Sequence, residues 1–90
     1  MAHTVRDRKK LLARVRRIAG QVAALESALA DGADCGQVLT QIAAAKGAMH
    51  GLMMEVLGGH LAEHVVAEAD QAARRREAEA LLALLRGFAR

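Results

Sequence analysis

Two long runs of apolar residues recur at alternating steps of three and four along this chain. The first run is made of Leu11, Val15, Ile18, Val22, Leu25 and Leu29. Steps of three and four place the side chains on one stripe of an α-helix. The run therefore predicts a helix over about residues 4–30, with Thr4 as a candidate amino-terminal cap.

The second run has the same spacing and consists of Cys35, Val38, Ile42, Ala45, Met49, Leu52 and Val56. Steps of four extend its face to His60 and His64, which predicts a second helix over about residues 35–65. Gly58 and Gly59 each cost up to about 1 kcal/mol in a helix interior, so the helix either bends or ends there or continues at that cost. The short turn segment 31–34 predicts an antiparallel hairpin of the two helices.

A third helix is expected over about residues 70–88, with Leu81, Leu85 and Phe88 on one side. The fold class is therefore all-α, a three-helix protomer in a single domain of residues 1–90. Hydrophobic residues make up 53% of the chain, and there is no proline. Because this is more apolar surface than so short a chain buries easily, two hairpins should pair as an antiparallel four-helix bundle.

Positive charge is concentrated in the first predicted helix. Seven of the residues 6–17 are Lys or Arg, and only Asp7 is acidic. Arg6, Lys10, Arg14 and Arg17 form a ridge beside the apolar stripe, while Lys46 is the one Lys or Arg of the second helix. Such a ridge is often only a solvated face, but this density favours binding to the phosphates of double-stranded DNA.

The sequence does not favour a membrane-binding or an exported protein. The apolar face lacks aromatic membrane anchors, so no membrane partner is expected. There is no signal peptide or long uncharged apolar run, and a lone cysteine fits a reducing compartment, so a cytoplasmic protein is expected.

Cys35, His60 and His64 are candidate metal ligands. The two histidines are four residues apart and share one helical face. Cys35 and His60 are separated by roughly 37 Å if one helix joins them, because each residue adds ~1.5 Å. A metal could therefore be shared only if a second, antiparallel subunit brought its own cysteine to the histidine end. The plainer interpretation is a buried thiol and two ordinary polar residues.

Other residues are candidates for completing such a site. His3 and the amine of Ala2, freed by removal of Met1, would chelate an ion together, unless the terminus is simply disordered. Asp34 and Glu63 would orient the ligands, or would be a helix cap and a solvated acid. One thiolate with several nitrogen donors suits Ni(II), Co(II) or Zn(II) better than Cu(I). His50 is interpreted as a structural or surface residue.

Three segments carry a family resemblance: RVRRIAGQ at 14–21, LTQIAAAKG at 39–47 and GLMMEVL at 51–57. Together with His3, Cys35, His60 and His64, they resemble the CsoR/RcnR family of metal-sensing repressors, especially its nickel- and cobalt-sensing members. The resemblance covers essentially the whole chain.

The resemblance implies a homotetramer, a dimer of dimers, that represses an efflux operon until Ni(II) or Co(II) binds. It also implies that Cys35, His60 and His64 are core ligands, and that His3 and the Ala2 amine complete a six-coordinate site. Arg14, Arg17 and Lys46 would contact operator DNA.

Two alternatives remain at this point. A sensor of formaldehyde or reactive sulfur in the same family would use Cys35 as a nucleophile and would not need His64. A metal-storage or structural helical oligomer would not bind DNA at all. An enzyme is not expected, because no set of nucleophile, base and oxyanion donor is visible.

Overall fold

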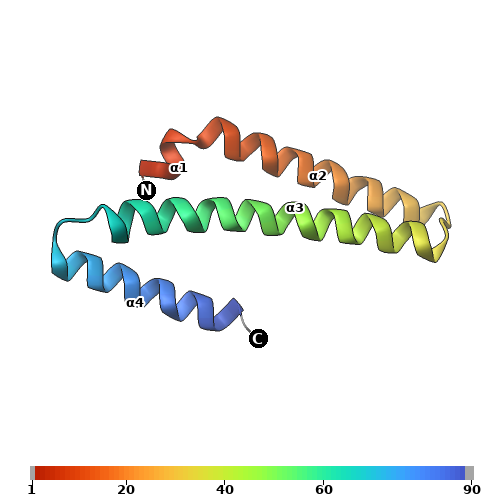
Figure 1. The fold of residues 1–90 in the computed structure, drawn as a ribbon. Coiled ribbons are helices and arrows are strands. Elements are labelled where there is room, and N and C mark those ends of the chain that lie inside the picture. Colours follow the sequence, from red (N-terminus) through yellow and green to blue (C-terminus); the bar gives the residue numbers. More distant parts are fainter. Residues whose placement is uncertain (1, 89–90) are drawn as a thin grey trace. The chain divides into compact units, whose positions relative to one another are not determined.

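The computed structural model describes the backbone of residues 2–88 and the side chains of residues 4–88. Every element of this described part is helical, which confirms the all-α prediction: α1 (Ala2–Arg6), α2 (Arg8–Ala30), α3 (Cys35–Leu61), the π-helix η1 (Ala62–Val66) and α4 (Gln71–Phe88). Figure 1 labels α1, α2, α3 and α4. The chain divides into two compact units. We call Asp7–Glu55 the hairpin unit, and Met1–Arg6 with Val56–Arg90 the terminal unit.

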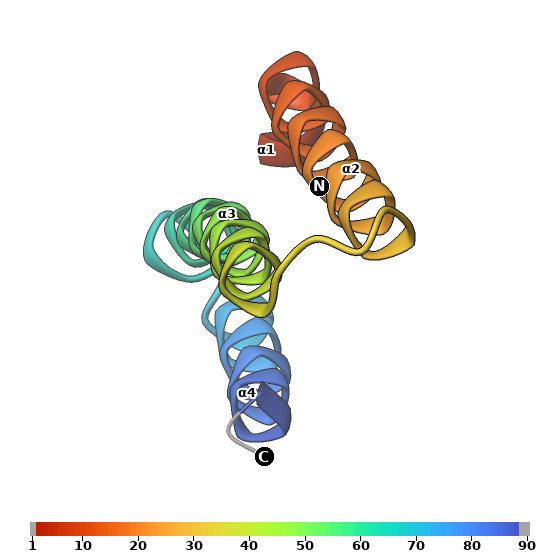
Figure 2. The ribbon, with the colours of Figure 1, turned by 90° about the vertical axis from the view of Figure 1, so that its right-hand side faces the viewer.

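The hairpin unit contains α2 and the first part of α3, joined by a tight turn that Figure 2 shows from its end. The Ala33 N–H donates to the Ala28 carbonyl at 2.9 Å, and the Gly32 N–H donates to Leu29 at 3.3 Å. This pair of bonds is a Schellman motif, which satisfies the last carbonyls of a helix. Gly32 has a φ of 73°, a left-handed conformation in which glycine has no steric penalty. The predicted turn is therefore present.

The amino-terminal helix differs from the single helix expected over residues 4–30. The backbone leaves the helical path at Asp7 (φ −99°, ψ 15°), and α2 begins at Arg8. The Asp7 carbonyl accepts the Leu11 N–H at 2.9 Å, so it opens the hydrogen-bond ladder of α2. Aspartate is a poor helix-interior residue but is favourable at a helix start. Thr4 consequently lies inside α1 and is not the cap of the long helix.

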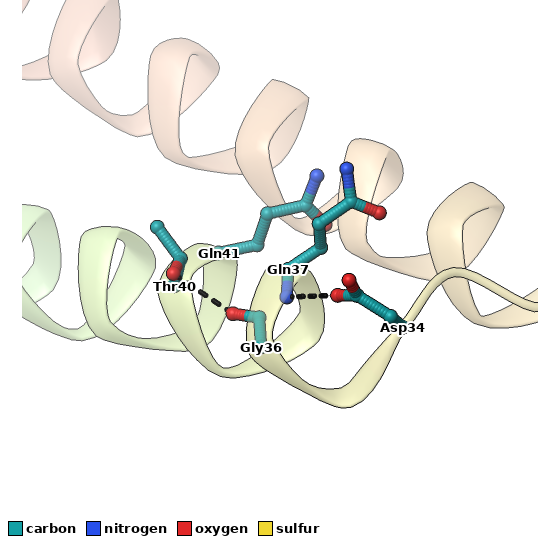
Figure 3. Close-up of a pocket in the computed structure, with 5 residues that line it drawn as sticks. All are labelled: Asp34, Gly36, Gln37, Thr40 and Gln41. Atoms are coloured by element: carbon teal, nitrogen blue, oxygen red, sulfur yellow. Dashed lines mark hydrogen bonds between the residues drawn. The ribbon is translucent and has the colours of Figure 1, made fainter.

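The second long helix begins where the sequence predicts. Asp34 precedes α3, and its Oδ1 accepts the Gln37 N–H at 2.7 Å, as Figure 3 shows. This is the N-cap geometry, which satisfies one of the free N–H groups of the first turn. The α-helix then continues through Gly58 and Gly59 to Leu61, where the backbone changes to the π-helix.

The apolar stripe of each hairpin helix separates into two rows. On α2, Ile18 is buried (5% exposed) and Leu11 and Leu25 are half-buried, whereas the residues four further on are exposed: Val15, Val22 and Leu29. On α3, Val38 and Ala45 are half-buried, whereas Ile42 and Met49 are exposed. A step of four residues turns the side-chain direction by the same angle about each helix axis. In an antiparallel pair, these two turns lead to the same side of the hairpin. The exposed rows therefore form one apolar face, which we call the open face.

The terminal unit packs η1 against α4. Asp70 caps α4, because its Oδ2 accepts the Ala73 N–H at 2.9 Å. Leu81 is buried, whereas Leu82, Leu84, Leu85 and Phe88 are exposed along α4. None of the helices in residues 2–88 is both long and apolar enough to span a bilayer.

Candidate metal centre and cationic cluster

The structure brings His60 and His64 together. Their ring centroids are 4.8 Å apart, and the ring planes are tilted by 44°. His60 lies in the last turn of α3, and His64 lies in η1. A π-helix has more residues per turn than an α-helix and is frequent at functional sites. Two adjacent imidazoles on consecutive turns are a common donor pair for a borderline divalent metal.

Glu77 of α4 fixes one of these imidazoles. Its Oε2 lies 3.3 Å from His60 Nε2, and the His60 side chain is only 19% exposed. A carboxylate at this distance from an imidazole nitrogen can orient the ring, as carboxylates do for histidines at metal sites. Sequence reasoning missed Glu77, because the contact depends on how α4 packs and no periodicity signals it.

Glu63 precedes His64 in η1. Its side chain is half-buried, and its Oε2 is buried without a hydrogen-bond partner among the described residues. A buried carboxylate oxygen with no partner costs free energy, which a metal or a ligand N–H group would relieve. Glu63 is therefore not a fully solvated acid, and its role beside the ligands stays a prediction.

Cys35 is the first residue of α3, and its thiol is free and exposed. The neighbouring Asp34 carboxylate is engaged as the helix cap, so the cap interpretation of Asp34 is the one that the structure supports. Within residues 4–88, no three His, Cys, Asp or Glu side chains come together as a metal site. The other predicted ligands, His3 and the Ala2 amine, lie outside the residues whose side chains are described.

A pocket of about 550 Å³ opens beside the start of α3. It is lined by Asp34, Gly36, Gln37, Thr40 and Gln41, drawn in Figure 3. Two hydrogen bonds lie within it, since the Thr40 hydroxyl donates to the Gly36 carbonyl at 2.8 Å and Asp34 accepts from the Gln37 N–H. Gln41 Oε1 is buried without a hydrogen-bond partner among the described residues.

Two cations of α2 meet a carboxylate of α3 within the hairpin unit. Lys10 Nζ lies 2.8 Å from Glu55 Oε1, and Arg14 Nη1 donates to Glu55 Oε2. These hydrogen bonds, from Lys10 first and then from Arg14, lower the pKa of Glu55, and the bond with Glu55 raises the pKa of Lys10. We call Lys10, Arg14 and Glu55 the cationic cluster. Sequence reasoning identified the two cations but missed Glu55.

Gly51 gives Arg14 the space that this cluster requires. A Cβ atom at residue 51 would come within 2.6 Å of Arg14 Nη2, so the guanidinium lies against the bare backbone of α3. A missing side chain at this position allows an arginine, with its planar set of donors, to fit between the helices.

The other residues predicted to contact DNA lie outside the cationic cluster. Arg17 and Lys46 are exposed on α2 and α3. Arg6 belongs to α1 and to the terminal unit, so the expected ridge along one continuous helix is interrupted before Lys10.

An all-helical chain with clustered cations and with thiol and imidazole donors has the features of a small effector-responsive regulator. The chain belongs to the metal-sensitive transcriptional repressor family, whose sequence profile matches residues 7–87. The resemblance to the CsoR/RcnR family is thereby confirmed, and proteins of this family are regulators, not enzymes.

Relatives match over nearly their whole length. The chain is 54% identical over 89 residues to an uncharacterised protein of the bioA 5′ region in Serratia marcescens, with 98% of each chain covered. It is 47% identical over 88 residues to the transcriptional repressor RcnR of Salmonella typhimurium, again with 98% coverage of each. Among solved structures, it is similar to a variant of the formaldehyde-responsive regulator FrmR from Salmonella enterica serovar Typhimurium, with a TM-score of 0.84 and 44% identity. That match covers 92% of this chain and 94% of the other.

Proposed function

We propose that this protein is a repressor that binds operator DNA when metal-free and releases it when Ni(II) or Co(II) binds. Release of the DNA would permit expression of metal-efflux genes. Zn(II) is a further candidate effector. The observation that carries the proposal is the His60–His64 pair, with Glu77 Oε2 3.3 Å from His60 Nε2. An imidazole oriented by a carboxylate is the arrangement found at many metal sites.

Cys35 would complete the site from a second subunit. It belongs to the same seven-residue register as Ile42 and Met49, whose side chains are exposed on the open face. A second copy that covered this apolar face would bury Cys35 at the same time. This supports a dimer with shared metal sites, and a dimer of dimers is the proposed assembly. His3 and the Ala2 amine are proposed as additional ligands.

DNA contact is proposed for the cations of the hairpin unit, chiefly Lys10, Arg14 and Arg17. Lys46 and Arg6 are proposed to contribute at its margins. Metal and DNA would bind alternative states of the oligomer, so each would weaken the other by the same factor. A useful switch needs a coupling of about 1–3 kcal/mol or more.

The test combines two titrations of the full-length protein. Co(II) should produce absorption bands of a metal–thiolate complex that are lost in Cys35→Ser. The same Co(II) should lower affinity for a labelled duplex that the metal-free protein selects from a random-sequence pool, measured by fluorescence anisotropy. The repressor mechanism is wrong if that affinity is unchanged at saturating Co(II) and Ni(II).

A formaldehyde or reactive-sulfur sensor is the second candidate function. It is favoured by the similarity to the formaldehyde-responsive FrmR and by the exposed thiol of Cys35. His64→Ala separates the two functions, because a thiol-based sensor has no need of this imidazole. Loss of the Co(II) response with retained thiol reactivity supports the metal sensor. Formaldehyde-driven release that needs Cys35 but not His64 supports the alternative. A storage or structural oligomer would select no DNA sequence.

A further inference from the structure

The first turn of α2 has an unusual charge balance. Arg8, Lys9 and Lys10 occupy it, and it contains no acidic residue. The free N–H groups and the helix dipole add further positive potential at this end. Such a helix start attracts an anion, and phosphate is a common one.

Glu55 is the anion that Lys10 and Arg14 hold in the free protein. Its two carboxylate oxygens are divided between the cations, Oε1 at 2.8 Å from Lys10 Nζ and Oε2 bonded to Arg14 Nη1. The Glu55 side chain is 22% exposed, whereas Lys10 is 70% exposed, so the cluster is open to solvent on the lysine side. A carboxylate bridging a lysine and an arginine uses the same donors that a DNA phosphate would use.

We propose that Glu55 is an internal substitute for a DNA phosphate, which DNA must displace from Lys10 and Arg14. This inference rests on the proposed DNA-binding function and names a competing group within it. Glu55 therefore lowers affinity for every duplex, whatever its sequence, by occupying two donors and by repelling the incoming phosphate. The shifted pKa values of Lys10 and Glu55 agree with a charge pair that persists at neutral pH.

The test measures salt dependence for a mixed-sequence 30-bp duplex, using the full-length protein and fluorescence anisotropy in rising KCl. Glu55→Gln should bind more tightly, with a slope of log K against log [KCl] steeper by about 0.9 for each additional phosphate contacted. That slope corresponds to about an eightfold gain at 0.1 M KCl per contact, if affinity at 1 M is unchanged. Circular dichroism confirms that the variant is folded.

Glu26→Gln is the matched control, because it makes the same change of net charge at an exposed glutamate of α2 for which no hydrogen bond or ion pair is found among the described residues. It should leave the slope unchanged. Lys10→Gln should reduce the slope more in the Glu55→Gln background than alone, because only there is Lys10 available to phosphate. If Glu55→Gln does not fold, Glu55→Asp, with a shorter reach, should show a smaller gain in the same direction.

Weaker binding by Glu55→Gln, equal gains for the Glu26 and Glu55 variants, or additive effects of Lys10 and Glu55 would each overturn the proposal. So would a protein that binds no duplex even at low salt. If Glu55→Gln behaves as expected but the unmodified protein selects no sequence from a random pool, the phosphate-substitute role stands and the repressor function fails.

Discussion

Ile42→Ala should weaken self-association without unfolding the protomer. Ile42 is 44% exposed on the open face, in the row that also contains Met49. Full burial of an isoleucine side chain contributes about 1.5–3 kcal/mol, so covering the exposed part of Ile42 contributes about 1 kcal/mol. In a two-fold symmetric dimer the loss occurs twice, about 2 kcal/mol in all, which is about a 30-fold rise in the dissociation constant.

Sedimentation over a dilution series measures that constant. The control is Ile18→Ala, the same chemical change in the inward row of the same apolar pattern, where Ile18 is 5% exposed. It creates a cavity inside the protomer and should cost about 2–5 kcal/mol of unfolding free energy. If Ile42→Ala leaves the dissociation constant unchanged, the open face is not the interface between copies, and the argument for burying Cys35 there fails.

Three further predictions concern the polar contacts. Asp34→Ala should lower the melting temperature by about 4–8 °C through loss of about 1 kcal/mol of capping, whereas Asp34→Asn should keep it, as thermal unfolding will show. Glu77→Gln should weaken Co(II) binding about 10- to 100-fold, measured by competition with a chelator. The control is Glu79→Gln, because Glu79 pairs with Arg75 and its loss should leave Co(II) binding unchanged. Equal effects of the two variants would exclude the orientation of His60 by Glu77. Because the pKa of Glu55 is lowered in the folded protein, its pairing with Lys10 stabilises the fold above the ordinary glutamate range and is lost as pH falls through the lowered pKa. The stability difference between the unmodified protein and Glu55→Gln, measured by melting at several pH values, should therefore shrink on acidification, and a constant difference would contradict this.

The helices were largely predictable because their apolar residues follow a strict helical period. The hairpin turn, the Asp34 cap and the start of α3 were predicted for local reasons, since caps and turns depend on a few adjacent residues. The break at Asp7 and the π-helix at Ala62–Val66 were not predicted. Asp7 lies before the first apolar run and the π-helix lies after the last residue of the second run, Val56, so the apolar periodicity carries no signal for either.

The apolar pattern also could not separate the two rows of the stripe. Ile18 and Val22 are four residues apart and equally apolar, yet one is buried in its own hairpin and the other is exposed. Both belong to one continuous stripe in the sequence. Only the packing of α2 on α3 decides which row stays exposed for a partner. The sequence therefore predicted that some apolar surface would be left over, but not which residues form it.

Glu55 and Glu77 were missed for a shared physical reason. Each is a carboxylate that bonds a functional side chain from another helix, Arg14 in one case and His60 in the other. Such contacts join residues far apart in sequence, and nothing local distinguishes these glutamates from solvated ones. These two glutamates nevertheless affect what a substitution of their partner residue measures. Removing Arg14 also leaves a half-buried Glu55 with one partner fewer, so its measured effect on DNA binding combines a lost phosphate contact with a newly available negative charge. The contribution of Arg14 to DNA binding is therefore obtained only from a double-mutant cycle with Glu55→Gln.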